Sequence, residues 1–154
     1  MKNCIKNRFL LPALIAAISL FPTHPATAQT FTTLHAFTNS PDGATPYAGL
    51  VLSGNTLYGT APYGGNAGNG TIFAVNTDGT GYTNLYRFTD SDYCFNPMAG
   101  LVLSGSTLYG TGFGVGGAVF AINTDGSGFA VLHTFIYSDG VYPYGGLVLS
   151  GTTL

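Results

Sequence analysis

The sequence predicts an all-β fold built from tandem repeats of about fifty residues, and three observations support this prediction. The segment Gly-Leu-Val-Leu-Ser-Gly occurs three times, beginning at Gly49, Gly100 and Gly146. Short runs rich in β-branched and aromatic residues alternate with turns rich in Gly and Asn, which is typical of strands. After residue 28, no stretch shows the 3.6-residue apolar period of a helix. Each repeat is therefore expected to form one four-stranded antiparallel blade of a propeller-like array.

The first repeat shows how one unit is expected to fold. Its four strands are predicted at residues 50–52, 56–58, 71–75 and 82–88. Gly54-Asn55 and Asp78-Gly79 are expected to form tight turns, because these residues tolerate the positive φ angles of hairpins. One such meander has two apolar faces, so neighbouring units are expected to bury each other's faces.

The repeats do not divide the sequence evenly. Residues 31–37 match a fourth strand, two units follow at about 34–84 and 85–131, and a third, 132–154, stops within its second strand. Propellers usually contain four to eight blades. The sequence therefore predicts an incomplete array of about two and a half units. We expect a fragment of a longer protein, with self-association of short chains through open blade edges as the alternative.

Residues 1–28 have the layout of a secretory signal peptide. Three basic residues precede an apolar run at 9–21, and an Ala-Thr-Ala cleavage site ends at Ala28. The alternative is an N-terminal anchor that stays uncleaved. The mature repeat region is then 29–154, and no apolar run in it is long enough to cross a membrane. These features predict an exported protein, either secreted or held at the cell surface.

The charge and cysteine content of the mature region narrow the expected partners. After residue 28, Arg87 is the only cation against six aspartates, which gives a net charge of −5. One cation cannot neutralise a phosphate backbone, so nucleic acid is not an expected partner. Cys94 is the only cysteine of this region, and it is expected to be buried, with pairing to another chain as the alternative.

No cofactor and no metal site is predicted. Each Asn-Thr-Asp-Gly turn, at 76–79 and 123–126, offers one carboxylate, whereas calcium takes six to eight oxygen ligands. Gly112-x-Gly114-x-x-Gly117 has the letters of a dinucleotide fingerprint. It lies between two predicted strands without the following helix that binds the phosphates, so we discard it.

Two longer motifs carry a family resemblance. Residues 70–81 read Gly-Thr-Ile-Phe-Ala-Val-Asn-Thr-Asp-Gly-Thr-Gly, and residues 117–128 read Gly-Ala-Val-Phe-Ala-Ile-Asn-Thr-Asp-Gly-Ser-Gly. With the Leu-x-x-Phe elements that follow, they resemble the GloVer tandem repeat of secreted bacterial proteins. The resemblance covers residues 31–154 and implies a β-propeller-like fold and export. It implies no established activity and transfers no catalytic residue.

Positions that vary between repeats are the candidate functional positions. The connections from the fourth strand to the next first strand, and from the second to the third, are expected to emerge on one side of the array. Aromatic rings beside carboxylates there would suit a sugar, although these residues could simply shape the loops. The candidate ligand-binding residues are Asp42, Tyr47, Tyr63, Asp92, Tyr93, Asp139, Tyr142 and Tyr144. His35, Tyr86 and His133 occupy equivalent fourth-strand places, where packing is expected rather than catalysis.

Two functions follow from these residues. The first is a non-catalytic secreted scaffold for binding or surface display, with a glycan or another protein as its partner. The alternative is a propeller-type glycoside hydrolase or lyase that uses Asp42, Asp92 and Asp139, which lie at nearly matching places in the repeats. The region lacks Glu and a Gly-x-Ser-x-Gly motif, so the scaffold is favoured and no catalytic residue is assigned.

Overall fold

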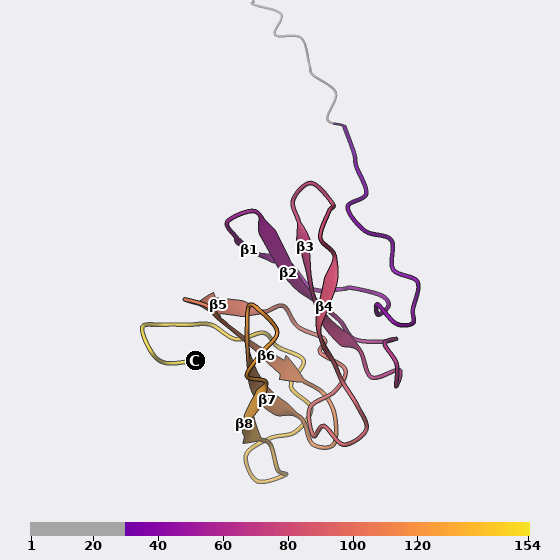
Figure 1. Cartoon of the computed structure of the whole chain (residues 1–154). Coiled ribbons are helices and arrows are strands. Elements are labelled where there is room, and N and C mark those ends of the chain that lie inside the picture. Colours follow the sequence, from indigo (N-terminus) through magenta and orange to yellow (C-terminus); the bar gives the residue numbers. More distant parts are fainter. Residues whose placement is uncertain (1–29) are drawn as a thin grey trace, which may run out of the picture. The chain divides into compact units, whose positions relative to one another are not determined.

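Two four-stranded antiparallel sheets contain all the named strands of this computed structural model, which describes residues 30–154 (Figure 1). The first sheet has the order β1-β2-β3-β4, with β1 at Val51–Ser53, β2 at Thr56–Ala61, β3 at Thr71–Asn76 and β4 at Thr83–Arg87. The second has the order β5-β6-β7-β8, with β5 at Val102–Ser104, β6 at Thr107–Gly112, β7 at Ala118–Asn123 and β8 at Ala130–Thr134. Neither sheet closes on itself. The predicted all-β class and the four strands of each full repeat are confirmed.

The predicted signal peptide, 1–28, lies outside the described residues. Within the part of the chain that the structure does describe, no helix is long and apolar enough to span a bilayer.

The two sheets repeat the same register, residue for residue. Gly59 lies opposite Phe73 in the first sheet, and Gly110 lies opposite Phe120 in the second. The pairing of each fourth strand with its third strand shifts register at the equivalent place, next to Phe73 and next to Phe120. Such a bulge inserts one residue and bends the strand. One repeat of the sequence therefore corresponds to one sheet, including its irregularity.

The beginning of the third repeat follows the same pattern. The glycine of the first hairpin turn has a positive φ in each copy: 57° at Gly54, 58° at Gly105 and 60° at Gly151. Only glycine adopts this conformation without a steric cost. Ser150 and Thr153 form an isolated antiparallel bridge across the third turn. The conformation of this turn is therefore determined by its own residues and does not require a complete four-stranded sheet.

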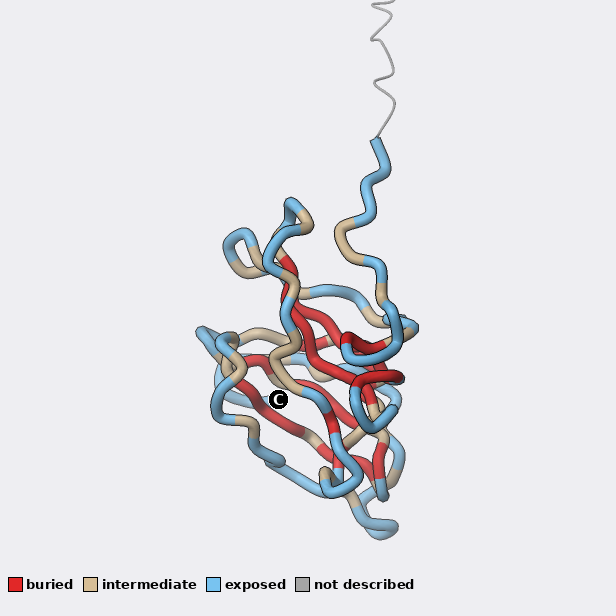
Figure 2. The backbone as a smooth tube through the Cα atoms, turned by 45° about the vertical axis from the view of Figure 1, so that its right-hand side comes forward, coloured by how far each residue is buried: buried red, intermediate tan, exposed pale blue. Residues whose placement is uncertain are grey.

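A hydrophobic core joins the two sheets. Its buried members come from β2 and β3 of the first sheet, from β6 and β7 of the second, and from Phe88, Cys94 and Leu101 in the connection between the sheets. Figure 2 shows the buried segments of the backbone in red, surrounded by exposed loops. Phe88, which directly follows β4 of the first sheet, contacts Phe120 of the second sheet, with ring centroids 5.7 Å apart. Removing this apolar surface from water stabilises both sheets together.

Cys94 belongs to the same core, and its predicted burial is confirmed. Burial raises the pKa of its thiol to about 12, and the nearby carboxylate of Asp92 adds to the shift. The thiol therefore stays uncharged and unreactive at neutral pH.

The expectation that residues 31–37 form a fourth strand is wrong for the part of the chain described, where no strand is assigned before β1. The physical reason is that no third strand lies beside this segment to share its backbone hydrogen bonds. Its side chains nevertheless pack like those of a fourth strand. Phe37 joins the smaller core cluster of Ala61, Phe73 and Val75 on the first sheet.

Candidate functional site

The long connections of the repeats meet through hydrogen bonds. The Ala44 N–H donates to the Tyr63 carbonyl at 2.7 Å, and the Asn96 amide side chain donates to the Pro62 carbonyl at 2.6 Å. In the last pair of connections, the Tyr142 N–H donates to the Gly116 carbonyl at 2.8 Å. We call residues 38–49, 62–70, 89–100, 113–117 and 136–146 the loop surface. The tight turns contact one another separately, for example through the Thr77 N–H and the Asn55 carbonyl.

A strained residue precedes the proline in each fourth-to-first connection. Thr45, Asn96 and Tyr142 have φ angles of 52°, 51° and 61°, and each is followed by proline. Residues before proline normally adopt an extended conformation, and positive φ is uncommon for residues other than glycine. At Asn96, hydrogen bonds to the Asn69 and Pro62 carbonyls hold the conformation. Such strain is kept where the surrounding structure fixes the loop.

Aromatic rings gather in two groups on the loop surface. Tyr47 and Tyr63 meet edge to face, with centroids 6.5 Å apart. Phe113 stacks on Tyr142 at 4.8 Å and contacts Tyr144 at 5.1 Å. The four tyrosines are exposed, whereas Phe113 is half-buried beside its partners. The structure thus brings four of the predicted site residues together in these groups.

At two residues, Tyr93 and Phe113, the candidate site differs from the one that the sequence predicted. Tyr93 is exposed, and among the described residues it has no aromatic neighbour. Phe113 was missed by the sequence prediction. Aligning the Thr-Leu-Tyr-Gly-Thr copies would have found it, because Phe113 takes the place of Pro62 directly beside Tyr63.

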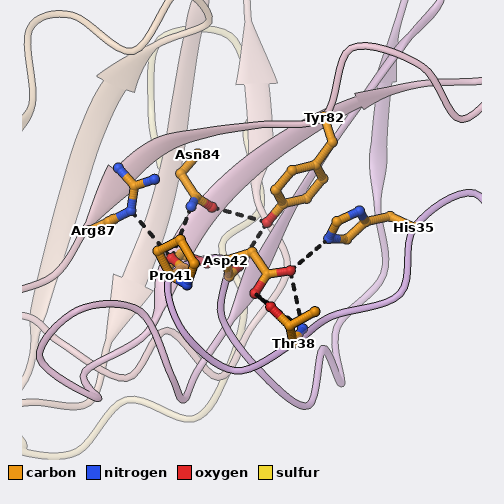
Figure 3. Close-up of polar contacts among 8 residues, drawn as sticks. His35, Thr38, Pro41, Asp42, Tyr82, Asn84 and Arg87 are labelled. Atoms are coloured by element: carbon orange, nitrogen blue, oxygen red, sulfur yellow. Dashed lines mark hydrogen bonds and ion pairs between the residues drawn. The ribbon is translucent and has the colours of Figure 1, made fainter.

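The predicted site aspartates accept hydrogen bonds within their own turns. Asp42 is 7% exposed and accepts hydrogen bonds from the Thr38 N–H at 3.1 Å, the Thr38 hydroxyl at 2.7 Å and His35 Nε2 at 3.0 Å (Figure 3). The ring of His35 stacks on Tyr82 with centroids 3.6 Å apart. The Tyr82 hydroxyl donates to the Asp42 carbonyl at 2.7 Å, which closes the cluster.

The other repeats contain an equivalent aspartate that accepts hydrogen bonds from a backbone N–H and from an aromatic residue. Asp92 accepts from the Thr89 N–H at 2.6 Å and from the Tyr86 hydroxyl at 3.0 Å. Asp139 accepts from the Ile136 N–H at 2.7 Å and from His133 Nε2 at 3.0 Å. The sequence predicted ligand groups at these aspartates and packing groups at the fourth-strand residues. Their pairing was missed, although each aspartate follows its aromatic partner by six or seven residues.

These hydrogen bonds determine the acidity of the carboxyl groups. Burial raises the pKa of Asp42, but hydrogen bonds from Thr38 and His35 outweigh it and hold the pKa below its ordinary value. The hydrogen bond from the Ile136 N–H lowers the pKa of Asp139 most; a smaller desolvation effect raises it, and His133 lowers it further. A catalytic general acid needs a raised pKa near the working pH, so these two shifts run in the opposite direction. Within residues 30–154, no group of three His, Cys, Asp or Glu is placed to hold a metal ion.

Sheets that repeat one register, joined by recurring loops and a recurring aromatic–aspartate device, define a tandem β-repeat protein. A family model described as the Gloeobacter/Verrucomicrobia repeat matches residues 19–154, and the chain belongs to this family. The resemblance predicted from the two repeated motifs is thereby confirmed. The search of curated proteins found no match to the chain.

Proposed function

We propose that this chain is an exported, non-catalytic repeat scaffold that binds its ligand through the aromatic groups of the loop surface. The observation that carries the proposal is the group formed by Phe113, Tyr142 and Tyr144, whose rings contact one another at an exposed place. Clustered exposed aromatic rings mark interfaces, and tyrosine supplies a rigid apolar face with a polar tip.

The ligand class that suits this surface is a glycan. A sugar ring has an apolar face that stacks on an aromatic ring, and its hydroxyl groups bond to polar tips such as the Tyr hydroxyl. The loop aspartates are bonded within their turns, so the tyrosines remain as the principal contacts. A protein that presents similar apolar and polar groups is the second candidate ligand to test.

Equivalent contacts between consecutive repeats support a propeller-like arrangement and, with it, the scaffold role. The fourth strand of one repeat packs on the next repeat through a stacked aromatic pair, Tyr86 on Phe129, with centroids 3.8 Å apart. His35 and Tyr82 repeat the arrangement one unit earlier. Junctions of the same geometry add repeats along one direction and present the variable loops together.

Export is supported by the layout of residues 1–28 and by the mature composition, with one cation and one buried cysteine. Expression of the full chain in a bacterium tests it directly. The expected product is found outside the cytoplasm with its N-terminus near residue 29, which mass spectrometry measures. A product that stays in the cytoplasm at full mass would contradict export.

Binding is tested with the full chain on a glycan array, followed by titration of the best glycan. Replacing Tyr142 and Tyr144 with Ala is expected to weaken binding at least tenfold. Tyr137→Ala is the matched control, because Tyr137 is 90% exposed and lies outside both aromatic groups. A blank array together with an empty pull-down would overturn the binding role and leave a purely structural one.

A further inference from the structure

The second sheet ends in an uncovered surface that we call the presenting surface, formed by Leu132, His133, Phe135 and Ile136. Leu132 is 52% exposed, and Ile136 is also exposed. At the equivalent places of the first sheet, Leu85 and Tyr86 are half-buried, and Phe88, which matches Phe135, is only 1% exposed. Within residues 30–154, no ring of another repeat stacks on His133, in contrast to Tyr86.

The presenting surface has a close copy near the start of the described chain. Leu34-His35-x-Phe37 repeats the pattern of Leu132-His133-x-Phe135. The His and Phe rings are edge to face in both, at 4.8 Å and 4.9 Å and at the same interplanar angle of 86°. The His Nε2 atom lies 3.0 Å from an aspartate oxygen in both. The two segments therefore offer a partner nearly identical chemistry.

The partner of the first copy is visible in the structure. Thr71, Tyr82 and Asn84 of the first repeat form what we call the receiving surface. There Tyr82 stacks on His35, with ring centroids 3.6 Å apart. The Tyr82 and Thr71 hydroxyls donate to the Asp42 carbonyl at 2.7 Å and 3.1 Å. Residues 132–139 contain the same groups. His133 matches the stacked His35, and the backbone carbonyl of Asp139 matches that of Asp42.

Two further contacts fix the N-terminal segment on the receiving surface. Asn84 Nδ2 and Arg87 Nε donate to the Pro41 carbonyl at 3.0 Å and 3.3 Å (Figure 3). The corresponding surface of the second sheet, with Phe129, is already covered by Tyr86. Residues 30–154 thus contain one uncovered presenting surface, while both sheets have their receiving surfaces occupied.

We infer that residues 34–42 form a cap that occupies the receiving surface of the first sheet and prevents head-to-tail association with the presenting surface of a second copy of this chain. Head-to-tail contacts that do not close into a ring generate open filaments, and an occupied receiving surface blocks such contacts. The cap has no strand partner, so side-chain contacts and a few hydrogen bonds hold it. A second copy with the same contacts can compete for its place.

Sedimentation velocity of the full chain and of a cap-weakened double variant, His35→Ala with Phe37→Ala, tests the inference. The wild type is expected to remain monomeric, and the double variant is expected to associate increasingly with concentration. Adding Leu132→Asp to the double variant should restore the monomer, and Leu132→Asp alone should change nothing. A folded double variant that stays monomeric, or association that persists with Leu132→Asp, would overturn the cap.

A second measurement keeps the inference testable if the double variant unfolds. A synthetic peptide of residues 130–140 is added at millimolar concentration to the wild-type chain. The expected result is a shift of the His35 ring NMR signals toward those of an unstructured chain, because the peptide displaces the cap. A peptide with Ala in place of His133 and Phe135 is the matched control. Unchanged His35 signals at every concentration, or equal shifts with both peptides, would contradict the inference.

Discussion

The aromatic residue at the fourth-strand position of a repeat makes two contacts where another repeat lies beside it. Its ring stacks on a ring of that repeat, and its polar atom bonds to the aspartate of its own turn. His35 and Tyr86 both do so, although one is an imidazole and the other a phenol. Both rings present a flat face and a polar tip at similar reach, which explains why the two residue types exchange at this position. Packing and turn geometry are thereby coupled within single residues.

The Asp42 carboxylate is expected to make the stability depend on pH in the acid range. Its pKa in the folded chain lies below the ordinary 3.8, so the native state binds fewer protons than the unfolded state near that pH. The free energy of unfolding is therefore highest above pH 3.8 and falls as the pH drops through the folded pKa. Urea unfolding between pH 2.5 and 6 measures this slope (about the range in which carboxylates titrate).

Asp42→Asn supplies the control for that measurement. The variant is expected to be less stable at neutral pH and to lose stability less steeply on acidification. Asp78, Asp125 and Asp139, whose pKa values are also lowered, keep part of the slope. Equal slopes in the variant and the wild type would show that Asp42 does not contribute.

Gly110 is expected to tolerate no side chain. A Cβ atom there would lie 2.6 Å from Cζ of the buried Phe120 and 2.9 Å from a Leu101 methyl group. Because the ring cannot move without disturbing the core, Gly110→Ala is expected to lower the free energy of unfolding by about 1–3 kcal/mol. Gly49→Ala is the control, since no heavy atom outside Gly49 and its two chain neighbours lies within 4 Å of the place that its Cβ would take. Equal stability of the two variants in chemical denaturation would contradict the close packing.

At the scale of elements, the two junctions use different chemistry on the same geometry. The cap meets Thr71, Tyr82 and Asn84, which all donate hydrogen bonds to it. The corresponding places in the second sheet are Ala118, Phe129 and Val131, whose side chains have no hydrogen-bonding group. A lone segment needs the polar contacts because it has no sheet of its own, whereas β4 is already held by β3.

Tyr82→Phe is expected to weaken the cap junction selectively. The change removes the hydroxyl, which lies within hydrogen-bond distance of the Asp42 carbonyl and of Asn84 Oδ1, but keeps the ring that stacks on His35. The expected loss is about 1 kcal/mol for one hydrogen bond, together with faster amide exchange in residues 34–42. Tyr137→Phe removes a hydroxyl from an exposed ring and should change neither quantity. Unchanged exchange in Tyr82→Phe would argue that stacking alone holds the cap.

At the scale of the whole described region, the shared core makes the two sheets depend on each other. Phe88 directly follows β4 of the first sheet, yet it packs on Phe120 and Phe129 of the second repeat. Phe88→Ala is expected to cost about 3–5 kcal/mol, as for other large-to-small core changes. The unfolding transition should stay single, because neither sheet has a complete core alone.

Hydrogen exchange provides the readout for this coupling. In Phe88→Ala, protection should fall together in β2 and β6, which lie in different sheets. Leu52→Ala is the control, because Leu52 lies on the edge strand β1 and is exposed. Protection lost in only one sheet would show that the sheets fold independently.

The sequence alone determined the repeat, the strand class, the turn positions and the family, because these depend on local residue patterns that recur along the chain. Gly54, Gly105 and Gly151 show this plainly: the turn requires a positive φ wherever the pattern occurs. Only the tertiary structure decided that His35 and Tyr86 stack on Tyr82 and Phe129, that Phe113 joins Tyr142 and Tyr144, and that residues 34–37 pack without forming a strand. Those outcomes depend on which repeat lies beside which, and contacts between residues far apart in the chain leave no local pattern in the sequence.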